Sequence, residues 1–224
     1  MITHYFENGY YIPFISYIIY KYTSDLFLSL IVMLKLFPTN YYFHFSSKYR
    51  YLDGNYNMLK QFVRFTDTGH LISFLLYFFP NLIGLAFNVH FIITFAYWIG
   101  IFLFSFKDND DIDITILNKS FLNFWVILNH SLPLVLIIYK LVSNDYSYNM
   151  FNMFNLLISY LWIYSWFIFI YLPWRLVTSD PVYSILSDEE KIQNKIIFIF
   201  IVKILFIFSN FVGFNIFNSF NDFD

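Results

Sequence analysis

Long apolar segments alternate with short polar ones along this chain. The clearest apolar run, Leu82 to Ser105, reads LIGLAFNVHFIITFAYWIGIFLFS and contains no formal charge. At about 1.5 Å per helical residue, such a run crosses a hydrocarbon core of about 30 Å. It is too long and too apolar for a soluble domain, so it predicts a transmembrane helix.

Similar runs elsewhere predict an all-α fold, a polytopic integral membrane bundle of about six transmembrane helices. No repeat or linker divides the chain, so we expect one transmembrane domain over residues 1–224. Lys21, Asp25 and Lys35 interrupt the first predicted helix, which can instead start near Leu26 or lie partly in the interface. The predicted helices are 12–37, 58–79, 82–105, 121–143, 150–173 and 193–219.

Composition supports a membrane protein and excludes some chemistry. Only 12% of the 224 residues are charged, about half the fraction in ordinary soluble domains. The net charge of −2 gives no indication of nucleic-acid binding. The chain has no cysteine, which excludes disulfides, thiolate metal sites and a cysteine nucleophile.

Positive charges are concentrated in the loops after the first, third and fifth predicted helices. The positive-inside rule places these loops in the cytoplasm or matrix and both termini on the opposite side. The residues concerned are Lys48, Arg50, Lys107, Lys119, Arg175 and Lys191.

The second predicted helix begins with polar residues, Thr66, Asp67, Thr68 and His70. Thr66 and His70 are four apart and share a helix face. One interpretation is a hydroxyl nucleophile with a base at the membrane surface. The other is a polar helix end, where the helix dipole favours Asp67.

Two further histidines, His90 and His130, lie inside apolar helices. Each can either make one interhelical hydrogen bond or act as a base in a water-accessible pocket. Pro133 should kink its helix and free the carbonyl of Asn129, so that Asn129 and His130 line a cavity. No metal or cofactor is expected, because the histidines lack i,i+4 spacing and carboxylates near them are scarce. Lys203 in the sixth predicted helix has three alternative roles: it pairs with Asp67, extends to the membrane surface, or faces another subunit.

Several short runs, in this order, resemble the androgen-induced family of six-helix membrane proteins. The resemblance covers most of residues 58–190, and animal members of that family hydrolyse fatty acid esters of hydroxy fatty acids. Phe65-Thr66 matches the segment that carries the family's nucleophilic threonine, and Leu128-Asn129-His130 matches the family's L-N-H. In the third helix the matching runs are Leu85 to Val89 and Phe95 to Ile99. In the loop after the fifth helix they are Val177-Thr178, Val182-Tyr183 and Leu186.

The chain also departs from that family. Pro80-Asn81 replaces a loop some twenty residues longer, and Asn88 stands where the family has proline. The family's catalytic histidine lies three residues after the L-N-H histidine, which is Pro133 here. Either His130 acts instead, or the base is missing. The threonine position aligns with either Thr66 or Arg64.

The resemblance implies a membrane-embedded lipid-ester hydrolase with Thr66 as nucleophile and His130, or less favoured His90, as base. Thr68, Asn129 or Ser131 would donate to the oxyanion. Membrane lipids are the expected partners, and the endoplasmic reticulum is the expected compartment. The alternative is a non-catalytic accessory subunit of a larger membrane complex, for example in the mitochondrial inner membrane. A transporter is disfavoured, because no inverted repeat is visible.

Overall fold

A computed structural model of the chain describes residues 9–45, 62–104, 116–143, 150–179 and 181–220. Within these residues the regular elements are all helical and no strand occurs, which confirms the all-α class. Short turns of 3-10 helix at Pro80–Leu82 and Ser184–Leu186 and a π-helical turn at Phe167–Tyr171 connect or extend the helices. The α-helices are α2 (Ile12–Thr23), α3 (Leu26–Phe45), α5 (Phe65–Leu75), α6 (Ile83–Phe104), α7 (Ile116–Ser143), α8 (Met153–Trp166), α9 (Leu172–Thr178) and α10 (Ile192–Phe220).

Four helical segments among the described residues are long and apolar enough to cross a membrane. They are Pro80–Leu103, Phe124–Ser143, Met153–Thr178 and Ile192–Phe220. These segments indicate an integral membrane protein, but the predicted count of about six spans is not confirmed.

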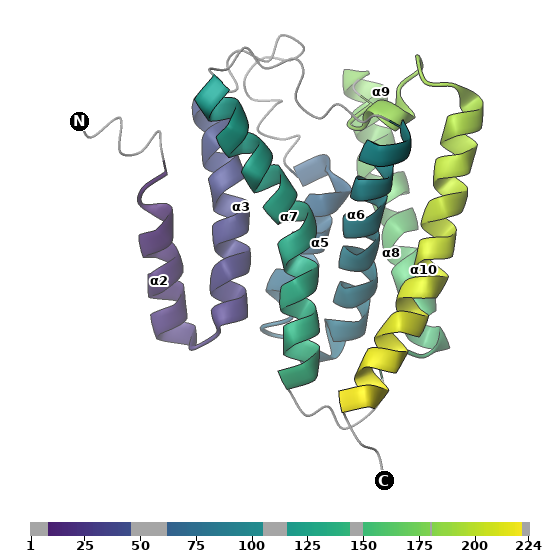
Figure 1. The fold of residues 1–224 in the computed structure, drawn as a ribbon. Coiled ribbons are helices and arrows are strands. Elements are labelled where there is room, and N and C mark those ends of the chain that lie inside the picture. Colours follow the sequence, from purple (N-terminus) through teal and green to yellow (C-terminus); the bar gives the residue numbers. More distant parts are fainter. Residues whose placement is uncertain (1–8, 46–61, 105–115, 144–149, 180, 221–224) are drawn as a thin grey trace.

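The prediction of one helix over 12–37 is wrong, because the chain turns back at Ser24 and forms a hairpin of α2 and α3 (Figure 1). The alternative start near Leu26 agrees with α3, which begins at that residue. Ser24 adopts the left-handed conformation with φ of 54° and ends α2. The Asp25 carboxylate then accepts a hydrogen bond from the Leu28 backbone N–H at 2.9 Å, which caps the start of α3. Asp25 also forms an ion pair with Lys140 of α7 at 3.2 Å. Asp25, which interrupts the single helix predicted over 12–37, therefore lies at the boundary between two shorter helices.

The second predicted helix, 58–79, is also longer than the observed element. Its first residues, 58–61, lie outside the described part of the chain, and α5 has 11 residues, about 16 Å of helix. That is too short to cross a hydrocarbon core of about 30 Å. Before Pro80 the backbone of Phe79 leaves the helical conformation, with φ −132° and ψ 77°, as expected for a residue that precedes proline.

The other four predictions agree better with the structure. The predictions 82–105 and 193–219 correspond closely to α6 and α10, and 121–143 ends where α7 ends. The prediction 150–173 stops too early, because the helical segment continues to Thr178. A π-helical turn precedes Pro173, which falls in the first turn of α9, where a missing N–H is tolerated.

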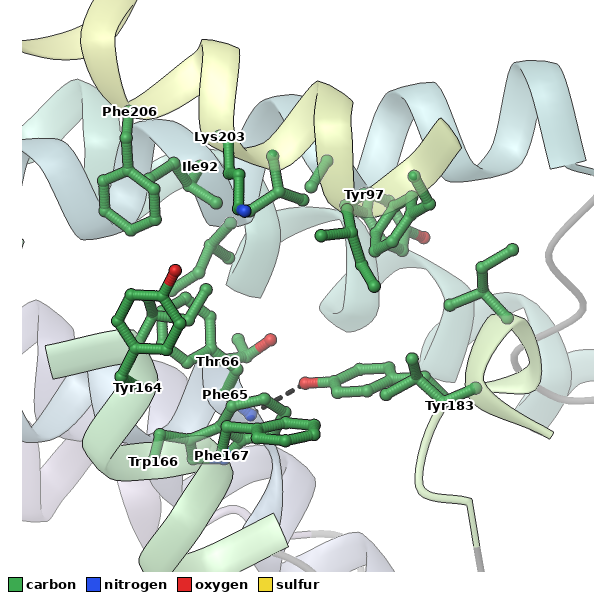
Figure 2. Close-up of a pocket in the computed structure, with 18 of the residues that line it drawn as sticks. Phe65, Thr66, Ile92, Tyr97, Tyr164, Trp166, Phe167, Tyr183, Lys203 and Phe206 are labelled. Atoms are coloured by element: carbon green, nitrogen blue, oxygen red, sulfur yellow. Dashed lines mark hydrogen bonds between the residues drawn. The ribbon is translucent and has the colours of Figure 1, made fainter. Parts of the chain in front are cut away.

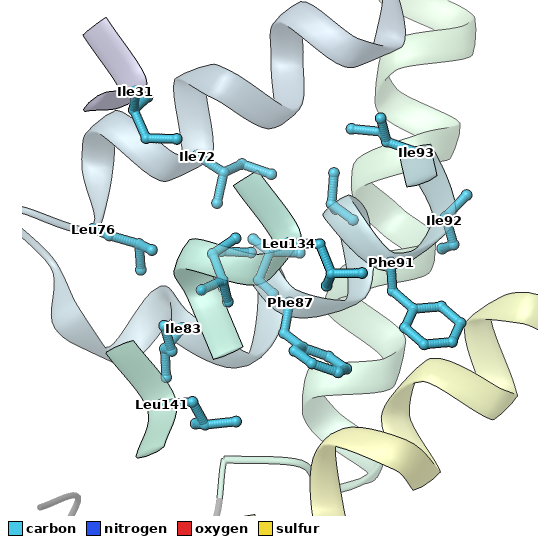
Figure 3. Packing of buried hydrophobic residues seen from close by; sticks show 14 of the residues in the cluster. Ile31, Ile72, Leu76, Ile83, Phe87, Phe91, Ile92, Ile93, Leu134 and Leu141 are labelled. Atoms are coloured by element: carbon cyan, nitrogen blue, oxygen red, sulfur yellow. The ribbon is translucent and has the colours of Figure 1, made fainter. Parts of the chain in front are cut away.

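The helix α6 forms the centre of the bundle and packs against α5, α7, α8 and α10. Of its most apolar window 61% is buried, against 17% for α10, whose outer face is rich in exposed Phe and Ile. Figure 3 shows its side chains Ile83, Phe87 and Phe91 within the core. A buried helix that is apolar on all sides has this pattern.

A polar cluster joins α6 to α8 and α10 inside this apolar surrounding. The Asn88 side-chain amide donates to Ser159 at 3.0 Å and to Asn210 at 3.2 Å. The Ser209 hydroxyl donates to the Asn88 oxygen at 2.9 Å. Interhelical hydrogen bonds of this kind hold membrane helices in register.

Candidate active site

A pocket of about 300 Å³ lies among α5, α6, α7, α8, α10 and the segment that precedes α10. Most of its lining is apolar, as Figure 2 shows for Ile92, Phe206 and Trp166. The polar groups at the pocket are few and come from different helices. They are Thr66, Tyr97, His130, Tyr160, Tyr164, Tyr183 and Lys203. A mostly apolar cavity with a few convergent polar groups is the usual form of a small-molecule site.

Thr66 and His130 meet at this pocket, although 64 residues separate them in the chain. The Thr66 hydroxyl in the first turn of α5 lies 3.3 Å from Nε2 of His130 on α7. The side chain of Thr66 is buried against its neighbours, with 9% of the residue exposed. A hydroxyl beside an imidazole nitrogen is the geometry of an activated nucleophile, and such contacts are often loose before substrate binds.

The hydrogen bonds of His130 determine which of its nitrogens can act as a base. Nδ1 lies 2.7 Å from the backbone carbonyl oxygen of Val126. A carbonyl only accepts, so in the neutral ring Nδ1 carries the proton and Nε2 presents its lone pair to Thr66. The ring also stacks on Tyr97 of α6, with 3.9 Å between centroids. His130 is therefore held in the orientation and tautomer that a general base needs.

Pro133 lies within α7, which changes direction along its length (Figure 1). Proline has no N–H to donate to the Asn129 carbonyl. The Thr94 hydroxyl donates to the next carbonyl, that of His130, at 2.5 Å. Of the two side chains expected at a cavity here, His130 lines the pocket and Asn129 does not.

The two other intramembrane histidines lie outside the pocket lining. Nε2 of His90 lies 2.7 Å from the Ser73 hydroxyl and 3.0 Å from the Gly69 carbonyl, within the α5–α6 contact. His70 is buried, its ring lies 5.9 Å from the His90 ring, and it does not line the pocket. Neither ring nitrogen of His70 makes a well-formed hydrogen bond to a described residue, although the Asn129 backbone is close. Both residues belong to the helix packing.

The residues expected to donate to an oxyanion are also elsewhere. The Thr68 hydroxyl donates to the Phe65 carbonyl at 2.7 Å and faces Trp162 of α8. Ser131 accepts a hydrogen bond from Trp98 at 3.2 Å. Neither Thr68, Ser131 nor Asn129 lines the pocket.

Tyr183 lines the pocket but was not among the predicted site residues. Its hydroxyl accepts a hydrogen bond from the Phe65 backbone N–H at 2.7 Å (Figure 2). Burial raises the pKa of Tyr183 to about 12, so the phenol remains protonated at neutral pH. The signal for it was Val182-Tyr183 in the loop resemblance, which assigned the residue no role.

Asp67 and Lys203 differ in their ionic partners among the described residues. Asp67 binds Lys35 of α3, so of the three alternatives for Lys203 the pairing with Asp67 is not the one observed. Lys203 lines the pocket from α10 and makes no ion pair with a described residue. In the part of the chain that the structure describes, no three His, Cys, Asp or Glu side chains are grouped to hold a metal ion.

No family model, curated protein or solved structure matches the sequence.

Proposed function

We propose that this protein is an intramembrane hydrolase of lipid esters, with Thr66 as nucleophile and His130 as general base. The observation that carries the proposal is the 3.3 Å contact between the Thr66 hydroxyl and Nε2 of His130 at an apolar pocket. The Val126 carbonyl supports it by holding the proton on Nδ1. The resemblance to the androgen-induced family points to the same chemistry, with His130 in place of the family's later histidine.

The first half-reaction forms an acyl-enzyme. The Thr66 oxygen attacks the ester carbonyl carbon, its proton passes to Nε2 of His130, and the π electrons move onto the carbonyl oxygen. When this intermediate collapses, the ester C–O bond breaks. The alcohol leaves with the proton from His130, and the acyl group remains on Thr66.

The second half-reaction returns the enzyme to its starting state. Water attacks the acyl carbon while His130 accepts one of its protons. The bond to the Thr66 oxygen breaks, the threonine regains its proton from His130, and a fatty acid leaves. The imidazole thus needs only one free nitrogen, the one that faces Thr66.

The surroundings suit a lipid substrate. The apolar lining can hold part of an acyl chain, since a pocket of about 300 Å³ lies at the small end of ligand sites. Thr66 is in the first turn of α5, near the end of the bundle where α3, α6 and α9 also end (Figure 1). This position is compatible with the depth of an ester group below lipid headgroups.

The test is turnover and covalent labelling of the detergent-purified protein. Wild type should hydrolyse a fluorogenic fatty acyl ester and react with a fluorophosphonate probe. Thr66→Ala should abolish both, while Thr68→Ala, two residues along the same helix and outside the pocket, should retain them. Each variant is checked for folding by thermal unfolding. Absence of turnover and labelling in folded wild type would reject the hydrolase.

The second candidate, an accessory subunit, predicts a different result in the same preparation. Co-migration with a large assembly in native gels, in the mitochondrial inner membrane and without turnover, would favour it. A free protein in the endoplasmic reticulum that hydrolyses lipid esters agrees with the enzyme.

A further inference from the structure

Acyl transfer at Thr66 requires a hydrogen-bond donor for the oxygen that becomes negative. Loss of one such donor typically costs about 10²- to 10³-fold in kcat. Thr68, Asn129 and Ser131 cannot supply it, because none of them lines the pocket. A donor beside Thr66 can be a backbone N–H or another side chain that lines the pocket.

The Tyr183 hydroxyl is held next to the nucleophile. It accepts a hydrogen bond from the N–H of Phe65, the residue directly before Thr66, at 2.7 Å. The Thr66 side chain is close enough to interact with the same hydroxyl. Because the oxygen accepts from Phe65, its own O–H remains available for donation into the pocket.

The ring of Tyr183 is fixed by its packing and by the backbone before it. It lies 6.3 Å from the Trp166 ring, which in turn contacts Phe65 at 5.2 Å. Val182 has a φ of 61°, a left-handed conformation that is uncommon for a β-branched residue. This conformation turns the chain so that Tyr183 points back towards α5 (Figure 2).

A buried tyrosine outside the pocket provides the contrast. Tyr171 is 6% exposed, and its ring lies 5.5 Å from that of Trp166. It does not line the pocket. Tyr171 is therefore a control for the loss of one phenolic hydroxyl that the proposed reaction does not use.

We infer that Tyr183 is a catalytic residue whose hydroxyl donates the hydrogen bond that stabilises the oxyanion formed on the ester carbonyl. This inference rests on the proposed function. In the resting state the hydroxyl lies beside Thr66. When the Thr66 oxygen bonds to the acyl carbon and gives its proton to His130, the carbonyl oxygen gains the electron pair and accepts the Tyr183 hydrogen bond. The phenol keeps its proton throughout.

The experiment compares Tyr183→Phe with Tyr171→Phe. Tyr183→Phe should lower kcat by about 100-fold with little change in KM, and Tyr171→Phe should stay within about threefold of wild type. Binding is measured with a fatty trifluoromethyl ketone, which forms an oxyanion on Thr66, and with the matched ether, which does not. Only the ketone should lose affinity in Tyr183→Phe.

Three results would contradict the inference, and they are distinguishable. If Thr66→Ala is inactive but Tyr183→Phe retains turnover within threefold, the hydrolase stands and the role of Tyr183 is wrong. If ketone and ether lose affinity equally, Tyr183 acts only on packing. If wild type neither turns over esters nor reacts with the probe, both proposals are wrong.

A structure of wild type with the bound ketone covers the case in which Tyr183→Phe does not fold. The Tyr183 hydroxyl should then lie about 2.7–3.1 Å from the hemiketal oxygen. A separation beyond hydrogen-bond range would overturn the assignment.

Discussion

Nδ1 of His130 lies 2.7 Å from the carbonyl oxygen of Val126, four residues earlier in α7. The helix that carries the proposed base therefore also orients its ring, and no carboxylate is needed for that purpose. In better-known triads a buried acid holds the imidazole tautomer. Here a backbone carbonyl in an apolar surrounding does so without placing a charge in the membrane.

His130 and His90 should respond oppositely to the same substitution. His130→Phe keeps the stacking on Tyr97 but removes the base, so kcat should fall by about 10²- to 10⁴-fold with little loss of stability. His90→Phe leaves Ser73 and the Gly69 carbonyl without their contact, which should cost about 1–3 kcal/mol of stability. Thermal unfolding and turnover per folded molecule separate the two. Equal loss of turnover in both variants would contradict the assignment of His130 as base.

The α2–α3 hairpin should be visible in labelling of single cysteines, because the chain has no cysteine of its own. Tyr22 beside the turn, Met153 at the start of α8 and Leu176 in α9 are 82%, 78% and 83% exposed. The turn lies at the end of the bundle where α7 ends, opposite α9 (Figure 1). An impermeant maleimide should thus modify Tyr22→Cys and Met153→Cys from one side and Leu176→Cys from the other.

A single helix over 12–37 would predict a different outcome. It would place residue 22 near the middle of the bilayer, where the reagent cannot reach it. An unreactive Tyr22→Cys in intact vesicles, with labelling restored by detergent, would therefore argue against the hairpin.

Gly213 of α10 should not tolerate a side chain. A Cβ there would clash with the ring of the buried Phe151, so Gly213→Ala should cost about 1–3 kcal/mol through overpacking. Phe151→Leu should make room for the methyl group and recover part of that loss in the double variant. The measurement is thermal unfolding in detergent. Additive effects of the two substitutions would show that they do not share this contact.

Lys203 should favour substrates that carry a negative charge. Its ammonium group lies at the pocket without an ion pair to a described residue. Lys203→Met removes the charge and keeps a long side chain, so KM should rise about tenfold for an ester with a free carboxylate, equivalent to about 1.4 kcal/mol. KM for the corresponding methyl ester should not change. An equal rise for both would mean that the lysine acts through packing.

Element type could be predicted from the chain wherever apolar length alone decides it. The run from Leu82 to Ser105 corresponds to α6, and 193–219 corresponds to α10, because a long, mostly apolar segment in a membrane satisfies its backbone hydrogen bonds as a helix. The hairpin at Ser24 and the short length of α5 could not be predicted from apolar length. Asp25 and Asp67 are tolerated where they lie because Lys140 and Lys35 from other helices pair with them.

In the candidate site, too, some features follow from the local sequence and others from helix packing. The sequence by itself determined a helical membrane protein, a polar start of the helix at Thr66 and a histidine at 130, since these depend on residue type and local spacing. The tertiary structure decided which polar groups meet: it joined Thr66 to His130, left His70 and His90 outside the pocket lining, and brought Tyr183 beside Phe65 across 118 positions of chain. The physical reason is that helix orientation depends on packing against α6. Rotation of one helix by a single residue would turn a pocket side chain towards lipid.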